Sequence, residues 1–544
     1  MAETVQPVSR RSDITSHHPG AGDHPKAYWP AFIAVLAFLC LPVTTVTYVP
    51  LVDYPNHLAR CYVLFHYHES LRYQALFKLA YEPIPNVAVD AVIVPLLALA
   101  PALTAAKLFL VFVISVYAAG CHLLSRTLYG RHTFLALAAM PTVYNSMFLE
   151  GFVNYVLGLG LFLTAFACWL EWRKQWSFSR MGMMIGLVAA SYLAHLSAYA
   201  FLAFACLVVW LWDYAVPPRN LSKKLLDLIP LAPPVLAFVA FMHGSGHVGA
   251  LVWNTISGKV IGFMPLFLTY QLQFDAFFCL AILLLAILAW KTSRSLEILW
   301  PVWTIGCLFF LFYLLCPLEL FTSSAADARF IPPALLLLLF SFQLKVPRRT
   351  GGALLLGVVA LCLIRVGLIW HTWNTMQPEL RNTVQLLSTL PPEASVYPAW
   401  FSRGKEEFVS SEATHASPSP FIAKVESIYR RSMEERSTKT ERVFFHTPLY
   451  AVITRQAYVP SLFAIRGQQP LVWRNPPHYR QPDATGRNPE RWMKLLGSYE
   501  YVWTYAAPPS IKQELNMIAI PVGVADNSIV WKLNASPADK SDCE

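Results

Sequence analysis

The apolar run YWPAFIAVLAFLCLPVTTVTYVPL, residues 28–51, decides the fold class of this chain. A transmembrane helix needs about 20 mostly apolar residues, and this run is too long for a signal-peptide core and lacks a small-residue cleavage site. We therefore expect an uncleaved first membrane span after a polar N-terminal segment, residues 1–28. The composition agrees, because 56% of the 544 residues are hydrophobic and only 14% are charged, as in polytopic membrane proteins.

The positions of Lys and Arg predict the topology. Basic residues gather in six short segments between apolar runs: Arg10/Arg11/Lys26, Arg126/Arg131, Arg173/Lys174/Arg180, Arg219/Lys223/Lys224, Lys291/Arg294 and Lys345/Arg348/Arg349. Cytoplasmic loops carry such an excess, so we expect a cytoplasmic N-terminus and an external C-terminus. About eleven spans result, at 29–50, 102–124, 133–149, 152–171, 181–197, 198–214, 225–243, 273–290, 297–316, 330–344 and 352–371.

The domain organisation follows from these spans. We predict a polytopic α-helical membrane domain over 29–371, with large external loops at 52–101 and 244–272, and a C-terminal extracytoplasmic α/β domain over 372–544. The run 87–101 is too short to span and is expected to be half-buried or interfacial. In the tail, residues 378–391 have helical spacing, whereas strand-like alternation occurs at 394–400, 442–447, 450–459, 499–507 and 527–533.

The stretch LVDYPNHLAR, residues 51–60, places charged groups where the first span leaves the membrane. If the chain turns helical after Pro55, then Asp53, His57 and Arg60 share one face, and Asn56 lies beside them. Such a carboxylate could accept a proton from a sugar hydroxyl or hold a divalent metal beside a phosphate. The alternative is structural, because Asp53 before Pro55 also fits plain helix capping.

Two arginines near the outer membrane surface form a second candidate group. Arg329 follows Asp327 at the start of the tenth span, and Arg365 lies within the eleventh. A charge inside the membrane is costly and marks a functional site by default, so the pair could grip a lipid phosphate. The alternatives are snorkelling of Arg365 and a local pair between Asp327 and Arg329.

Three further polar residues lie at predicted external turns. Glu150 and Asn154 fall between the third and fourth spans, and Glu150 is a second candidate carboxylate. The small residues that follow indicate close helix contact. His195 is at the tip of a tight hairpin between two spans, where a polar residue satisfied by its neighbours is the simpler interpretation.

Several function classes have no sequence support. The chain has neither a P-loop nor a GxGxxG motif, which argues against ATP-driven transport by this chain alone. It has no basic-aromatic motif for nucleic acid. Its spans also lack the buried acids of a proton-coupled pump.

The motifs DYPNHLAR (53–60), FLEGFVNYVLGLGL (148–161), AHLSAY (194–199) and DARFIPP (327–333) together resemble uncharacterised bacterial members of the GT-C superfamily of membrane glycosyltransferases. The resemblance implies a sugar donor linked to polyprenyl phosphate, with Asp53 as the catalytic acid of the first loop. It implies that Arg329 or Arg365 binds the donor phosphate. Many members pair two acidic residues in this loop, whereas Asp53 stands alone, which weakens the metal-dependent version with Mg²⁺ or Mn²⁺.

The resemblance and the positions of these residues together predict an inverting glycosyltransferase of a bacterial inner membrane, acting on an extracytoplasmic glycan or glycolipid. Asp53 would be the general base, with Glu150 as an additional carboxylate. His57 and Arg60 would orient the base or steady the departing lipid phosphate. The alternatives are a non-catalytic lipid-linked glycan transporter or envelope-assembly protein, and an O-antigen ligase or polymerase with a pyrophosphate donor.

Overall fold

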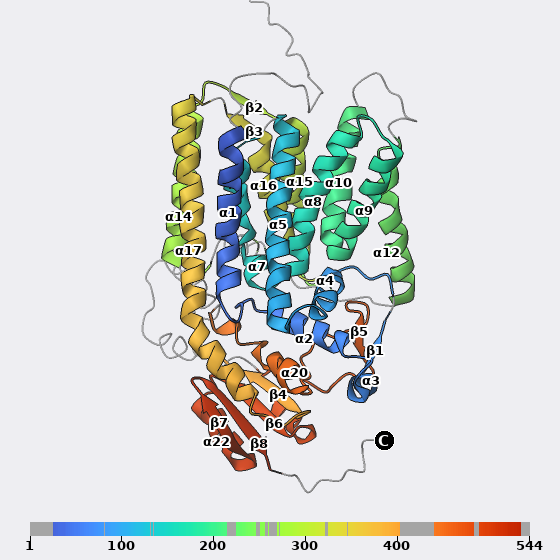
Figure 1. Ribbon diagram of the computed structural model, residues 1–544, viewed down its shortest axis with the longest axis vertical. Coiled ribbons are helices and arrows are strands. Elements are labelled where there is room, and N and C mark those ends of the chain that lie inside the picture. Colours follow the sequence, from blue (N-terminus) through green and yellow to red (C-terminus); the bar gives the residue numbers. More distant parts are fainter. Residues whose placement is uncertain are drawn as a thin grey trace, which may run out of the picture.

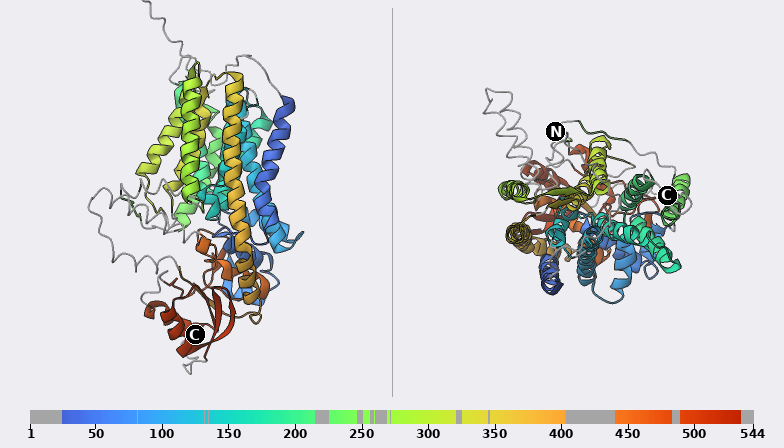
Figure 2. Two further views of the ribbon diagram at one scale, coloured as in Figure 1. Left: turned by 90° about the vertical axis from the view of Figure 1, so that its left-hand side faces the viewer. Right: turned by 90° about the horizontal axis from the view of Figure 1, so that it is seen from above.

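Long apolar helices dominate the computed structural model, and a smaller α/β domain lies at one end of them (Figures 1 and 2). The structure describes residues 25–80, 82–130, 132–133, 135–214, 225–245, 251–255, 259, 269–270, 272–320, 325–344, 346–402, 440–482 and 489–534. The N-terminal segment before residue 25 and much of the predicted loop 244–272 therefore lie outside the described residues.

Six described helices are long and apolar enough to cross a membrane. They are α1 (Pro25–Thr45), α5 (Ala102–Tyr129), α8 (Val153–Trp172), α10 (Leu196–Tyr214), α14 (Leu272–Thr292) and α17 (Arg348–Leu387). Shorter apolar helices complete the bundle: α4 (Ala88–Leu97), α9 (Phe178–Ala194), α12 (Ala232–Ser245), α15 (Trp300–Leu315) and α16 (Ile331–Ser341). The predicted multi-pass helical fold is thus confirmed.

Two predicted boundaries differ from the structure. The span 133–149 is not one helix but three short pieces, α6 (Leu135–Ala139), η1 (Met140–Val143) and α7 (Ser146–Leu149). Pro141 lies inside this stretch and Asn145 caps α7 with its side chain, so the chain breaks between them. Helix α17 runs without interruption through the predicted domain boundary at 371/372, so the last span and the first tail helix are one element.

The first loop is structured and short helices fill it. It contains α2 (Tyr54–Phe65), α3 (Leu71–Leu76), β1 (Phe77–Leu79) and α4. The predicted interfacial helix is α4, which buries Val89 and Ile93 and leaves Leu99, just after its end, 83% exposed. A loop with this much helix can hold side chains in fixed positions at the end of the bundle.

The C-terminal domain is built on a four-stranded mixed sheet with the order β4-β6-β8-β7. Its strands are β4 (Val396–Trp400), β6 (Tyr501–Tyr505), β7 (Ala519–Ala525) and β8 (Ser528–Leu533), with β4 parallel to β6. Helix α22 (Pro509–Ile518) buries Ile511 and Leu515 beneath the sheet. The α/β prediction is therefore confirmed for this domain.

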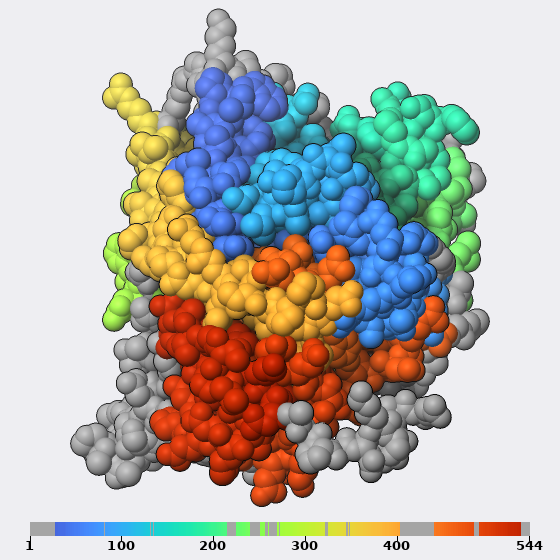
Figure 3. Space-filling view, turned by 60° about the horizontal axis from the view of Figure 1, so that its bottom comes forward, coloured from blue at the N-terminus to red at the C-terminus, as the bar shows by residue number. Residues whose placement is uncertain are grey.

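The segments 442–447 and 450–459 were expected to be strands, and that expectation is wrong. They form turns, the short helix η5 (Thr447–Leu449) and α20 (Tyr450–Arg455). Helix α20 contacts α2, and β1 pairs antiparallel with β5 (Leu471–Trp473). The C-terminal domain thus lies directly against the first loop, as the space-filling view also shows (Figure 3). Tertiary burial against α2 has overridden local strand propensity.

Helices α5 and α8 make the most extensive contact in the bundle. A Cβ atom on Gly160 would lie 2.8 Å from Tyr117 Cα, and one on Gly120 would lie 2.5 Å from the Gly160 carbonyl oxygen. The small residues after Glu150 therefore permit close backbone approach, as the sequence indicated.

We expect Gly160→Val to destabilise the protein, because the added atoms would overlap the α5 backbone. Overpacking of this kind costs about 1–3 kcal/mol. Thermal unfolding in detergent would measure the loss. Gly186→Val is the matched control, since nothing lies within 4 Å of the Cβ position at Gly186; equal stability of the two variants would contradict the assignment.

Candidate active site

Two loop segments, 51–53 and 149–151, lie side by side at the end of the bundle that carries the C-terminal domain. The Val52 N–H donates to the Leu149 carbonyl at 3.2 Å, and the Asp53 N–H donates to the Glu150 carbonyl at 3.0 Å. Gly151 has φ +89°, and a Cβ atom there would lie 2.7 Å from the Asp53 nitrogen. Only glycine fits this position, so the backbone brings the two predicted carboxylate positions together.

Asp53 occupies the position immediately before α2, yet its side chain makes no capping hydrogen bond. Its carboxylate is 22% exposed, and its Oδ1 lies 3.4 Å from Nε2 of His446, which comes from the C-terminal domain. The capping interpretation of Asp53 therefore fails. A partly exposed carboxylate facing an imidazole is instead available for proton transfer.

Asn56 links α2 to the C-terminal domain. Its side-chain oxygen accepts from the Phe463 N–H at 2.7 Å, and its Nδ2 lies 2.8 Å from the Ser461 carbonyl and 3.2 Å from His446 Nδ1. Asn56 is fully buried. The structure therefore gives this candidate a positioning role rather than contact with a substrate.

His57 contacts the C-terminal domain through its ring, which lies edge-on to Phe463 at a centroid distance of 5.6 Å. Burial lowers the pKa of His57 well below its usual range, and the neighbouring Arg60 and His446 side chains lower that pKa further. His57 is consequently neutral near pH 7. A neutral imidazole adds no positive charge beside a departing phosphate, which was one of the two roles predicted for His57.

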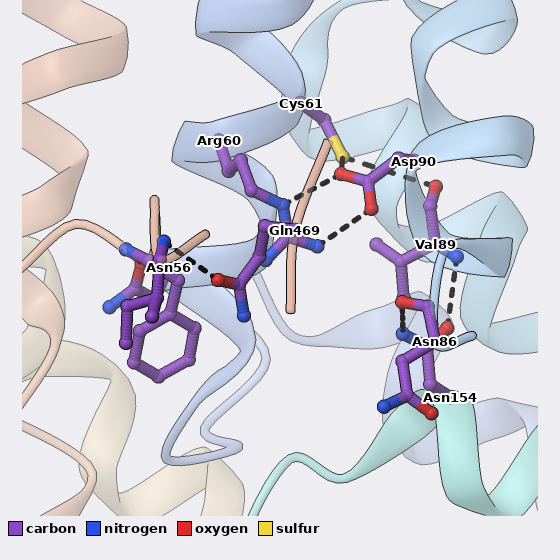
Figure 4. A network of polar contacts seen from close by, with 10 residues as sticks. Asn56, Arg60, Cys61, Asn86, Val89, Asp90, Asn154 and Gln469 are labelled. Carbon is purple, nitrogen blue, oxygen red and sulfur yellow. Dashed lines mark hydrogen bonds and ion pairs between the residues drawn. The ribbon is translucent and has the colours of Figure 1, made fainter. Parts of the chain in front are cut away.

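Arg60 forms a buried ion pair with Asp90 of α4 (Figure 4). Arg60 Nε lies 2.7 Å from Asp90 Oδ1 and Nη2 lies 2.9 Å from Oδ2, and both residues are buried. A bidentate pair of this kind fixes α2 against α4. Arg60 therefore does not converge with Asp53 on a shared ligand, and its predicted role in binding the donor phosphate is replaced by a structural one.

Asn154 also serves the first loop (Figure 4). Its side chain accepts from the Val89 N–H at 2.9 Å and donates to the Asn86 carbonyl at 2.6 Å. Asn86 has φ +69°, and the two bonds supply partners for backbone N–H and C=O groups where the chain turns into α4. Asn154 thus holds α4 against α8 and has no evident catalytic role.

Glu150 lies at the surface between the bundle and the C-terminal domain. Arg442 binds it with two contacts, Nη2 to Oε2 at 2.8 Å and Nη1 to Oε1 at 3.1 Å. The Arg442 side chain is 45% exposed, whereas that of Glu150 is 18% exposed. Glu150 remains a candidate second carboxylate, and Arg442 is a cation beside it that the sequence did not reveal.

Arg329 and His195 belong to the same end of the bundle. The Arg329 guanidinium lies over the Phe152 ring at 5.6 Å, two residues from Glu150, and the Arg329 carbonyl accepts from the Tyr155 hydroxyl at 2.7 Å. His195 lies between α9 and α10, as predicted, and its Nδ1 accepts from the Ser197 N–H at 3.1 Å. That bond caps α10, which matches the simpler interpretation of His195.

Asp327 pairs with a lysine that the sequence analysis overlooked. Lys259 Nζ lies 2.5 Å from Asp327 Oδ2, and both side chains are buried. The same nitrogen donates to the carbonyls of Tyr313 and Cys316. The sequence did not suggest this ion pair, and Asp327 also interacts electrostatically with Arg329, as the sequence did suggest.

Arg365 is buried in α17, and it does not snorkel out of the membrane domain. Its Nη1 donates to the Tyr144 carbonyl at 3.0 Å, and its Nε lies 3.7 Å from Asp275 Oδ1 on α14. The Tyr144 carbonyl is accessible because the chain breaks between η1 and α7. The broken span thus provides an acceptor for a buried cation.

Four partners of the predicted site residues had little or no sequence signal. His446, Arg442 and Lys259 are far in sequence from the groups they contact, in segments without a motif. Asp275, an acid at the start of an apolar helix, could have been found by its position in the first turn of α14. Within the described ranges, no three His, Cys, Asp or Glu side chains are grouped to hold a metal ion.

Comparison with known proteins gives a distant structural likeness. No family model matches the chain, and none of the curated proteins matches it. A solved structure to which it is similar is that of ArnT from Cupriavidus metallidurans in the apo state, with a TM-score of 0.45 and 13% sequence identity. The match covers 94% of this chain and 99% of that chain. A likeness at this level is too low for an activity to be transferred.

Arg60→Ala should destabilise the protein strongly, because it leaves the Asp90 carboxylate buried without its partner. Removing one member of a buried pair costs about 3–5 kcal/mol. Denaturant or thermal unfolding of the purified protein would measure this loss. The double variant Arg60→Met/Asp90→Leu should lose much less, and equal losses in the two proteins would contradict the ion-pair assignment.

Gly151→Ala should displace Asp53 and lower stability. The positive φ and the 2.7 Å approach to the Asp53 nitrogen together impose strain of about 1–3 kcal/mol. Unfolding temperature and turnover would both be measured, with Gly497→Ala as control, because nothing lies within 4 Å of its Cβ position. An unchanged Gly151→Ala protein would contradict the requirement for glycine at this position.

Proposed function

We propose that this protein is a membrane glycosyltransferase that moves a sugar from a polyprenyl-phosphate donor to an extracytoplasmic glycan or lipid acceptor, with inversion. Asp53 is the general base. One observation carries the proposal. The Asp53 carboxylate is partly exposed at the end of the bundle that carries the C-terminal domain, and it does not cap the helix that it precedes.

The charge distribution supports an extracytoplasmic site. The ends of α5, α8 and α14 that carry or adjoin Arg126, Arg173 and Lys291 lie away from the C-terminal domain (Figure 1). Because positive loops stay in the cytoplasm, the end with Asp53 faces outward. In a bacterium this orientation corresponds to the inner membrane, with the C-terminal domain in the periplasm.

In the reaction, the Asp53 carboxylate takes the proton of an acceptor hydroxyl as its oxygen attacks the anomeric carbon. The new bond forms on the face opposite the phosphate, and the bond from the anomeric carbon to the phosphate oxygen breaks. Its electron pair leaves with the polyprenyl phosphate. The backbone hydrogen bond between Asp53 and Glu150 places Glu150 near the base, where it would orient the acceptor. Arg442 balances the negative charge of Glu150.

The donor phosphate needs a cation near the membrane surface. Arg329 is the better candidate, because its guanidinium lies over Phe152, in the same turn as Glu150. Arg365 is engaged deeper in the bundle by the Tyr144 carbonyl and Asp275. Binding a phosphate with a preorganised guanidinium would stabilise the charge that develops on the leaving group. A requirement for Mg²⁺ or Mn²⁺ stays a prediction, to be tested with a chelator.

Asp53→Asn should reduce transfer to a slow residual rate while leaving donor binding intact, because the amide cannot accept the proton. Loss of a general base lowers the rate by about a hundredfold or more. Binding and turnover of polyprenyl-phosphate sugars would be measured with the protein in nanodiscs. Arg329→Ala should weaken donor binding in the same assay.

Glu69→Gln is the matched control, since Glu69 is an exposed carboxylate of the same loop whose contact is His66. Its turnover should equal that of the wild type. Normal turnover by Asp53→Asn would overturn the assigned base. Absence of any donor binding by the wild type would favour the transporter or assembly role instead, and a pyrophosphate-linked donor would favour a ligase or polymerase.

A further inference from the structure

His446 is an unassigned residue of the C-terminal domain that reaches the candidate base of the membrane domain. It is 4% exposed and lies between η5 and the turn that follows residue 440. One ring nitrogen, Nδ1, faces Asn56, and the other, Nε2, faces Asp53. The two ring nitrogens therefore have different partners. The position of the ring proton decides whether Asp53 faces a hydrogen-bond donor or an acceptor.

The surroundings of Asn56 determine the orientation of its amide. The Phe463 N–H can only donate, so the atom 2.7 Å from it must be the amide oxygen. The Ser461 carbonyl can only accept, so the atom 2.8 Å from it must be the amide nitrogen. Two backbone groups with opposite requirements thus leave the amide a single orientation.

This orientation fixes the tautomer of His446. The Asn56 Nδ2 is a donor, so the His446 Nδ1 that it meets at 3.2 Å must be the unprotonated acceptor. A neutral imidazole then carries its proton on Nε2. That nitrogen lies 3.4 Å from Asp53 Oδ1, so its N–H is the group of His446 that lies beside the carboxylate.

We propose that His446 is a positioning residue, held by Asn56 in the tautomer whose Nε2–H orients the Asp53 carboxylate for proton abstraction. The inference rests on the proposed function, in which Asp53 is the base. It adds that the membrane domain alone is an incomplete enzyme, because the C-terminal domain supplies the group that orients its base. The same logic operates wherever a base is oriented by a third residue.

Two substitutions separate the two ring nitrogens. In His446→Gln, the amide nitrogen takes the place of Nε2 and retains a donor toward Asp53. In His446→Asn, the shorter side chain reaches only the position of Nδ1 and retains an acceptor toward Asn56. We expect His446→Gln to keep most of kcat, and His446→Asn to lose about tenfold to a hundredfold, because a donor beside the charged carboxylate is lost.

The KM for the donor should be unchanged in both variants, because His446 acts on the base and not on the lipid phosphate. His66→Asn is the matched control: His66 pairs with the exposed Glu69 at 2.8 Å in the same loop, outside the site. Unfolding temperatures of all variants would identify any that merely fail to fold. A purely structural role for His446 would lower stability and activity alike in both variants.

The double variant Asp53→Asn/His446→Asn distinguishes this inference from the function on which it rests. If His446 acts through Asp53, the double variant should be no slower than Asp53→Asn alone. If Asp53→Asn is inactive but His446→Asn turns over normally, the positioning role is overturned and the base assignment stands. If Asp53→Asn is itself active, the proposed function fails first.

Discussion

The contact between the backbone segments 51–53 and 149–151 is the constraint on which the candidate site depends. Two hydrogen bonds join the segments, and a glycine at Gly151 makes the approach sterically feasible. Asp53 and Glu150 are almost a hundred residues apart in the chain, yet this contact brings them next to each other in the structure. Everything else in the site, including His446 and Arg442, is arranged around the two carboxylates it brings together.

The structure also shows how a membrane protein accommodates charge near the lipid boundary. Arg60 pairs with Asp90, Lys259 with Asp327, and Arg365 approaches Asp275. Burying an ion without its partner is far more costly than burying the pair, so Arg60 fixes α2 against α4 and Arg365 holds α17 beside α14. Asp53 differs from the acids in these pairs because its carboxylate is partly exposed and faces an imidazole.

Sequence reasoning succeeded where burial requirements are uniform along the chain. It predicted a multi-pass helical domain, and six described helices are long and apolar enough to cross a membrane, because a bilayer demands apolar stretches of a certain length. It failed for residues 442–447 and 450–459, where strand-like alternation gave way to turns and helix packed on α2. It also treated His57 and Arg60 as companions of Asp53, although their partners are Phe463 and Asp90. Helical spacing shows which residues could share a face but not which groups that face will meet.

The sequence by itself determined that this chain is a multi-pass helical membrane protein with an α/β tail, and that Asp53, Glu150 and Arg329 belong to one end of it. Composition and charge position suffice for that, because they reflect the local environment of each segment. Only the tertiary structure decided that Asn56 and His446, 390 residues apart, meet beside Asp53. Such a meeting depends on how the C-terminal domain docks on the first loop, and no local pattern of residue types encodes that docking.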